Sequence, residues 1–82
     1  MGIDTFQSIR SLRQAGSALR GRRKARGLTQ RDLAYRAGMP QSSVSDIETG
    51  VVSAGIDTYL RLLEAMGAEL RIHDRETGDG VF

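Results

Sequence analysis

Residues 29–50 constrain the fold of this chain most, because they predict two short helices separated by a tight turn at Gly38. Thr29 is suited to cap the first helix, and Asp32 follows at the spacing from which a carboxylate reaches back to the amide of the cap. The apolar residues of this helix recur at helical spacing and are Leu33, Ala34 and Ala37. Gly38 is expected to end the helix, because glycine adopts the left-handed conformation after a last turn at little cost.

The second helix of the pair is predicted over residues 41–49, and Pro40, with its fixed φ and missing amide, is expected to suit its first turn. Val44 and Ile47 give this helix a buried side. The residues that are thereby turned outward are Gln41, Ser42, Ser45 and Asp46. A glutamine can grip adenine in the major groove, and serines bind phosphates or either base edge, so this face is a candidate DNA reader. The alternative is a solvated helix face without a ligand.

Two further helices flank this pair. The first runs from a cap at Ser11 to about Arg26, and Gly16 and Gly21 are expected to weaken it by about 1 kcal/mol each relative to alanine. Its expected inner residues are Leu12, Ala15, Ala18 and Leu19. The last helix runs from about Asp57 to Met66. Its expected inner residues are Ile56, Tyr59, Leu60, Leu63 and Met66, with Leu62 at the boundary.

After Gly67 the apolar period changes from helical spacing to alternation. Ala68, Leu70 and Ile72 alternate with polar residues, which predicts a strand over 68–73. No second convincing strand is visible, and a strand must find a partner edge for its backbone. The economical partner is the same strand of a second copy, in an antiparallel pair about a two-fold axis. The alternatives are an extended tail or weak pairing with residues 3–7.

The expected fold is therefore mainly α: a bundle of four to five helices with a short C-terminal strand that pairs across a dimer. The expected organisation is an N-terminal arm (1–10), a helix-turn-helix domain (11–67), a dimerisation strand (68–73) and a flexible tail (74–82).

Composition excludes several function classes. The 82 residues contain no cysteine and a single histidine, His73, so neither disulfides nor a His/Cys zinc site can support the fold. No cofactor is expected, and no nucleophile, base or phosphate loop stands in a catalytic pattern, so an enzyme is not expected. There is no membrane span or signal peptide, so a cytoplasmic protein is expected. Residues 1–36 carry a charge of +7 and residues 37–82 a charge of −5, which suggests one pole for an anionic polymer and another for a different partner.

The segments 23–34, 37–39 and 44–50 closely resemble the Xre or Cro-type helix-turn-helix of phage repressors and bacterial regulators. Residues 62–72 further resemble the HipB-type antitoxins, in which a C-terminal strand pairs across the dimer. The resemblance implies a sequence-specific repressor, the antitoxin of a type II toxin–antitoxin system that regulates its own operon and binds a HipA-like toxin kinase. A stand-alone repressor without a toxin is the nearest alternative, and a protein-binding module that has lost DNA binding is the third.

The resemblance also assigns roles to individual residues. Gln30 matches a phosphate-contacting glutamine, and a helix N-terminus already favours anions. The positions that face the groove are Gln41, Ser42, Ser45 and Asp46, with Ser43 on phosphate. Arg23 and Glu48 match a structural ion pair between the first and third helices. Independently of the resemblance, the charges of Arg31, Arg36 and the basic end of the first helix make them candidates for phosphate neutralisation.

Two positions depart from the family pattern. Pro40 stands where a capping hydroxyl is common, so the next helix must start without it unless Ser43 helps. Asp46 replaces residues that are more often Asn, Gln or Arg. A carboxylate is repelled by phosphates but accepts a hydrogen bond from cytosine N4, so Asp46 either selects cytosine or weakens binding. The expected target is a palindromic operator bound by a two-fold dimer.

Overall fold

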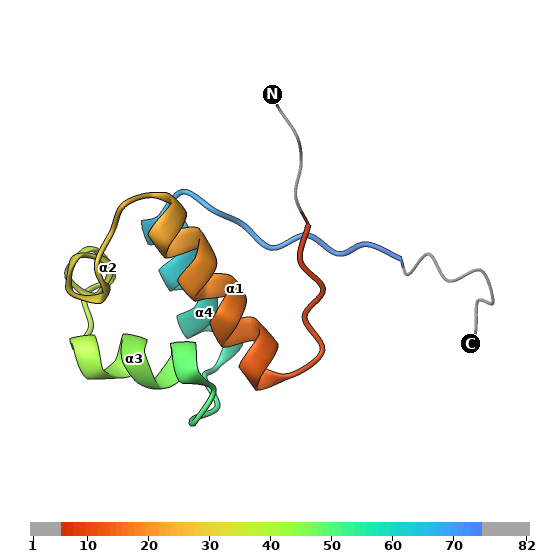
Figure 1. Cartoon of the computed structure of the whole chain (residues 1–82), viewed down its shortest axis with the longest axis horizontal. Coiled ribbons are helices and arrows are strands. Elements are labelled where there is room, and N and C mark those ends of the chain that lie inside the picture. Colours follow the sequence, from red (N-terminus) through yellow and green to blue (C-terminus); the bar gives the residue numbers. More distant parts are fainter. Residues whose placement is uncertain (1–5, 75–82) are drawn as a thin grey trace.

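The structure is a computed structural model, which describes residues 6–74 as four helices (Figure 1). They are α1 (Leu12–Ala25), α2 (Gln30–Ala37), α3 (Gln41–Thr49) and α4 (Ile56–Ala65). α1 packs against α3, and α2 packs against both α3 and α4. The mainly α helix-turn-helix bundle expected from the sequence is thereby confirmed, with four helices rather than five.

The starts of α1 and α2 follow from their capping residues. The Ser11 hydroxyl accepts a hydrogen bond from the Gln14 amide at 3.1 Å. At α2 the Thr29 hydroxyl accepts from the Asp32 amide, and the Asp32 carboxylate accepts from the Thr29 amide, both at 3.0 Å. The predicted capping box is therefore present, with aspartate in place of the usual glutamate or glutamine.

Gly38 determines how α2 leads into α3. It adopts the left-handed conformation, with φ of 71° and ψ of 39°. The Met39 amide then turns back to donate to the Ala34 carbonyl at 3.0 Å. This closed helix end is of the kind that glycine makes available at low cost, and it fixes the angle at which the chain enters α3.

Pro40 does not lie in the first turn of α3, so that prediction was wrong. It is the residue just before the helix, with an extended ψ of 149°, and its carbonyl accepts from the Ser43 amide at 3.1 Å. The sterically restricted proline φ is compatible with both positions, and the extended ψ is what decides between them. No side chain caps this end of α3, so the Ser43 hydroxyl does not replace the missing cap.

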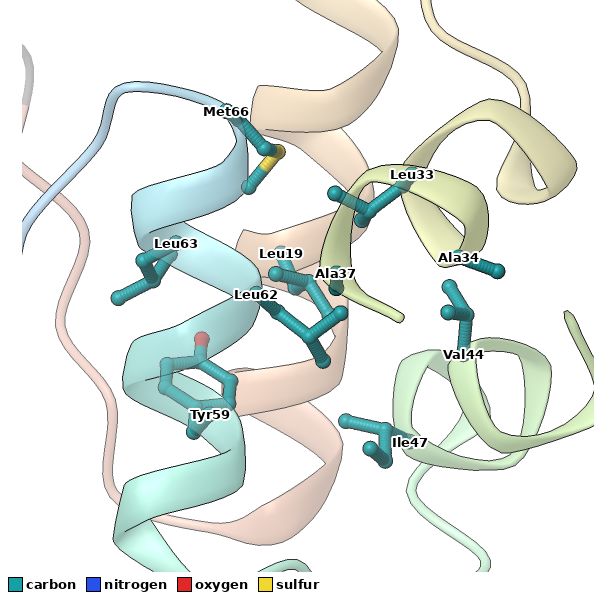
Figure 2. Packing of buried hydrophobic residues seen from close by; sticks show 10 residues of the cluster. All are labelled: Leu19, Leu33, Ala34, Ala37, Val44, Ile47, Tyr59, Leu62, Leu63 and Met66. Carbon is teal, nitrogen blue, oxygen red and sulfur yellow. The ribbon is translucent and has the colours of Figure 1, made fainter. Parts of the chain in front are cut away.

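The core lies between the four helices, and Figure 2 shows its side chains converging from all of them. The members of this cluster are Leu19, Leu33, Ala34, Ala37, Val44, Ile47, Tyr59, Leu62, Leu63 and Met66. The buried faces predicted for α2 and α3 are therefore confirmed.

The inner face of α4 was predicted correctly for Tyr59, Leu63 and Met66, which are buried, but not for its other residues. Leu62, placed at the boundary, is fully buried, whereas Leu60 is 44% exposed. At about 100° per residue, Leu60 and Leu62 cannot share a face, and the helix turns Leu62 toward the core. Leu12 and Ile56, also expected inside, are exposed because each is the first residue of its helix.

No strand is present within residues 6–74 of the single chain. Ala68 is held at the end of α4, where its amide donates to the Leu63 carbonyl at 2.8 Å, and it packs against the core. Beyond it the chain is extended and crosses the N-terminal segment in Figure 1, where the rings of Phe6 and His73 lie 5.9 Å apart. Leu70 and Ile72 are exposed there. Pairing of this segment across a dimer stays a prediction.

Parts of the predicted arm and tail, residues 1–5 and 75–82, lie outside the described residues. Within the described part, every helix is too short or too polar to cross a membrane.

Candidate nucleic-acid interface

The outer side of α3 is a continuous polar surface. Val44, Ile47 and Glu48 are the buried residues of this helix. Gln41, Ser42 and Asp46 are exposed on the opposite side, and Ser43 and Ser45 are partly exposed. Because Gln41 and Ser45, and likewise Ser42 and Asp46, are four residues apart, each pair shares one side of the helix. The surface offers hydrogen-bond donors and acceptors but carries no cation of its own.

A buried ion pair ties the C-terminal turn of α3 to α1. Arg23 Nε donates to Glu48 Oε2 at 2.6 Å, and Arg23 Nη2 donates to Glu48 Oε1 at 3.0 Å. The two side chains are only 8% and 1% exposed. The bidentate geometry is the strong form of this interaction, and the hydrogen bond to Glu48 raises the pKa of Arg23 further above its usual value. Within residues 6–74, every buried side-chain nitrogen and oxygen atom has a hydrogen-bond partner.

The same ion pair reaches two more segments of the chain. Arg23 Nη1 donates to the carbonyl of Leu28, in the connection between α1 and α2, at 2.7 Å. Gln30 Nε2 donates to Glu48 Oε1 at 3.1 Å. Gln30, the first residue of α2, is therefore joined to the end of α3. Neither link was predicted. Gln30 and Glu48 are 18 positions apart and meet only through the packing of α2 on α3.

Two cationic side chains lie on α2, the helix that begins with Gln30. Arg31 and Arg36 are both exposed, and Tyr35 between them is 88% exposed. The acid on this helix, Asp32, is engaged in the capping box, where the Thr29 backbone amide above all lowers the pKa of its carboxyl. The exposed face of α2 therefore presents two guanidinium groups and one carboxylate, and this carboxylate is hydrogen-bonded to Thr29.

The arrangement defines a class of protein: a polar helix, held at a fixed angle behind a glycine turn by a second helix, is a helix-turn-helix unit. Residues 14–76 match the family described as the helix-turn-helix domain. The chain belongs to this family, whose members are DNA-binding regulators and not enzymes.

Known proteins of two kinds are similar to the chain. Antitoxin HipB of Escherichia coli is 27% identical over 70 residues, which are 85% of this chain and 80% of HipB. The restriction-modification controller protein C.AhdI of Aeromonas hydrophila is 34% identical, with a TM-score of 0.68 over 71% of this chain and 88% of C.AhdI.

HipB is also similar in its solved complexes. The HipB–O4 20mer complex matches with 27% identity and a TM-score of 0.77, over 87% of this chain and all of that one. The HipA–HipB–O2–O3 complex matches with 27% identity and a TM-score of 0.76 over the same shares.

Proposed function

We propose that this chain is a sequence-specific DNA-binding repressor, and that it acts as the antitoxin of a HipBA-like system that regulates its own operon. The observation that carries the DNA-binding part is the outer side of α3, where Gln41, Ser42 and Asp46 are exposed and Val44 and Ile47 anchor the helix from behind. An α-helix fits the major groove, where such side chains can distinguish base pairs.

Within this proposal the polar residues divide by role. Gln41, Ser42, Ser45 and Asp46 face base edges from α3, and Ser43 lies near its N-terminus, where backbone amides favour a phosphate. Gln30 and Arg31, in the first turn of α2, contact the phosphate backbone of the DNA. Residues 1–36 carry a charge of +7, which supplies the attraction that is independent of sequence.

Reading of a palindrome requires two copies. We propose a homodimer in which residues 68–73 of the two copies pair antiparallel, so that Leu70 and Ile72 of both copies meet on one face of the pair. Both side chains are exposed in the single chain, at 40% and 101%, and the backbone beyond Ala68 makes no regular structure within residues 6–74. A two-fold axis would then place two α3 helices in major grooves about 34 Å apart.

The proposal that the chain is an antitoxin depends on its similarity to HipB, whose structure is known in the HipA–HipB–O2–O3 complex. The partner that fits is a HipA-like toxin kinase. Residues 37–82 carry a charge of −5, and outside α3 this half includes the exposed Asp57 and Glu64 of α4, which suit a protein partner rather than DNA.

Titration of the DNA upstream of the gene with the purified protein tests the repressor function. We expect saturable binding that weakens steeply as salt concentration rises, because bound phosphates release counterions. Gln41→Ala should bind the same DNA with relaxed preference at one base pair in each half-site. Absent binding, or binding that ignores salt, would favour a protein-interaction module that has lost DNA binding.

A stand-alone repressor is the second candidate, because C.AhdI, at 34% identity, is described as a restriction-modification controller protein. Expression with the product of the adjacent gene separates the two functions. A stable complex with a kinase-like protein supports the antitoxin, and operator binding without any such partner supports the stand-alone repressor.

A further inference from the structure

We infer that the buried Arg23–Glu48 pair positions the Gln30 side chain for a DNA phosphate, in addition to joining α1 to α3. The inference rests on the proposed function, since it concerns a contact made to DNA. It assigns to Glu48 the part of a positioning residue that acts through Gln30 and does not itself touch DNA.

Glu48 is the point at which the contacts meet. Its Oε2 accepts from Arg23 Nε at 2.6 Å, and its Oε1 accepts from both Arg23 Nη2 at 3.0 Å and Gln30 Nε2 at 3.1 Å. The Glu48 side chain is 1% exposed, so these three donors replace the water that the carboxylate has lost. The carboxylate cannot move without leaving a buried charge unpaired, and its position is accordingly fixed.

This fixed carboxylate determines how the amide of Gln30 is turned. A glutamine amide carries two N–H donors on its nitrogen and an oxygen that only accepts. Because Glu48 accepts only, Gln30 must turn its nitrogen, and not its oxygen, toward the protein. One N–H is used by Glu48 and the second remains on the partly exposed side chain, at the N-terminus of α2. A donor at a helix N-terminus suits an anion.

Arg23 makes this arrangement compatible with DNA. An unpaired carboxylate at this place would repel phosphates, whereas the bidentate pair cancels its charge. Arg23 also holds the Leu28 carbonyl at 2.7 Å, two residues before Gln30, so the backbone that leads into α2 is fixed by the same group. The network therefore orders both the main chain and the side chain of the contact, which reduces the entropy lost on binding.

The test is a double-mutant cycle that removes the network without leaving a buried charge. R23M and E48M together replace the ion pair with apolar side chains of similar length, a change that folded proteins often tolerate. The probe is the tightest duplex that the wild-type protein selects from a random-sequence library, and the affinities are measured for wild type, Q30A, the R23M/E48M protein and the triple variant. Thermal unfolding confirms that each variant is folded.

We expect Q30A to weaken binding about tenfold, the usual worth of a hydrogen bond to a charged group. R23M/E48M should weaken it to a similar extent, and Q30A should have little further effect in that background. The dependence of affinity on salt should keep its slope in all variants, because Gln30 is neutral and the pair carries no net charge. In the free protein, the side-chain amide protons of Gln30 should show slowed exchange in wild type and not in R23M/E48M.

Two results would overturn this inference and leave the proposed function intact. One is wild-type affinity in a folded R23M/E48M protein, and the other is additive effects of Q30A and R23M/E48M in the triple variant. A change in the slope of affinity against salt concentration would also overturn the inference. It would mean that the replacement had displaced the arginines of α2 and not Gln30. If the ion-pair replacement fails to fold, Gln30→Glu decides, since two facing carboxylates must turn the side chain away; retained affinity in that variant contradicts the inference. A wild-type protein that selects no duplex would overturn the proposed function and this inference together.

Discussion

Gly16 of α1 lies directly against the backbone of Glu48 in α3, so closely that a methyl group on Gly16 would be 2.5 Å from the Glu48 carbonyl oxygen. The same methyl group would lie even closer to the Ile47 carbonyl oxygen. These contacts involve main-chain atoms, which cannot swing aside as a flexible side chain would. The close approach of α1 and α3 therefore requires glycine at this position, and the sequence-based view of Gly16 as only a weak point of its helix was incomplete.

Gly16→Ala is expected to destabilise the fold in spite of the higher helix propensity of alanine. Forced overpacking costs about 1 to 3 kcal/mol, and the gain in propensity offsets about 1 kcal/mol of it. Chemical denaturation of the two proteins measures the difference.

Gly21→Ala, on the same helix, is the matched control, because the new methyl group would meet only the side chain of Gln7, which precedes the helix, at 4.0 Å. It should stabilise the protein by about 1 kcal/mol. If both alanines stabilise the protein equally, α1 and α3 do not approach as described.

Asp32 is expected to make folding sensitive to acid. The hydrogen bond from the Thr29 backbone amide, and then that with the Thr29 side chain, lowers the pKa of this carboxyl below its usual 3.8. Because the pKa of Asp32 is lower in the folded protein than in the unfolded chain, the carboxylate stabilises the fold above pH 3.8. This stabilisation is lost as the pH falls through the pKa of the folded protein. Asp32→Asn should accordingly lose less stability than wild type between neutral and strongly acidic pH. Parallel acid-denaturation curves would refute this role.

Tyr59 is expected to make folding sensitive to alkali. Its hydroxyl donates to the Ala15 carbonyl at 2.6 Å, and burial raises the pKa of the phenol above its usual 10.0. Because the pKa of Tyr59 is higher in the folded protein than in the unfolded chain, its contribution to stability is complete below pH 10.0. This contribution is lost as the pH rises through the pKa of the folded protein. Tyr59→Phe should cost about 1 kcal/mol at neutral pH and flatten the alkaline loss of stability. Tyr35→Phe, at a position 88% exposed, is the control and should change neither.

Local chemistry explains what could be predicted from the sequence. Thr29, Asp32 and Gly38 act through neighbours within a few residues, so their residue types alone indicate where α2 begins and ends. The buried faces of α2 and α3 follow from spacing for the same reason. The polar outer side of α3 then follows as the complement of its buried side.

What could not be predicted depends on packing between helices. Leu62 is not such a case, because helical spacing already places it on one face with the buried Tyr59, Leu63 and Met66, and the inward placement of Leu60 departed from that spacing. The bond between Gln30 and Glu48 depends on the crossing of α2 and α3, and polar residue types are compatible with many other partners. Spacing along one helix carries no information about such crossings.

Gln41→Ala is expected to change the DNA preference of the protein and not its fold. Gln41 is exposed at the start of α3 and has no part in the core, so its loss should leave thermal unfolding unchanged. A bidentate contact to a base pair is worth about 1 to 3 kcal/mol of discrimination, which should disappear at one position in each half-site. Selection of preferred duplexes by the two proteins measures this. Ser17→Ala, an exposed change on α1, is the control and should preserve the preference.

Leu70→Asp and Ile72→Asp are expected to convert a dimer into monomers without unfolding the domain. Both side chains are exposed in the single chain, so a carboxylate there costs the isolated fold little, whereas carboxylates of the two copies brought together on one face of the paired strands would repel each other. Sedimentation at several protein concentrations gives the oligomeric state, and circular dichroism checks the fold. Arg71→Ala is the control, because its pairing partner is the exposed Glu69 on the same segment and an exposed pair contributes little. If both aspartate variants remain dimers, the two copies associate elsewhere, and the exposed Ile56 and Leu60 of α4 are the next residues to change.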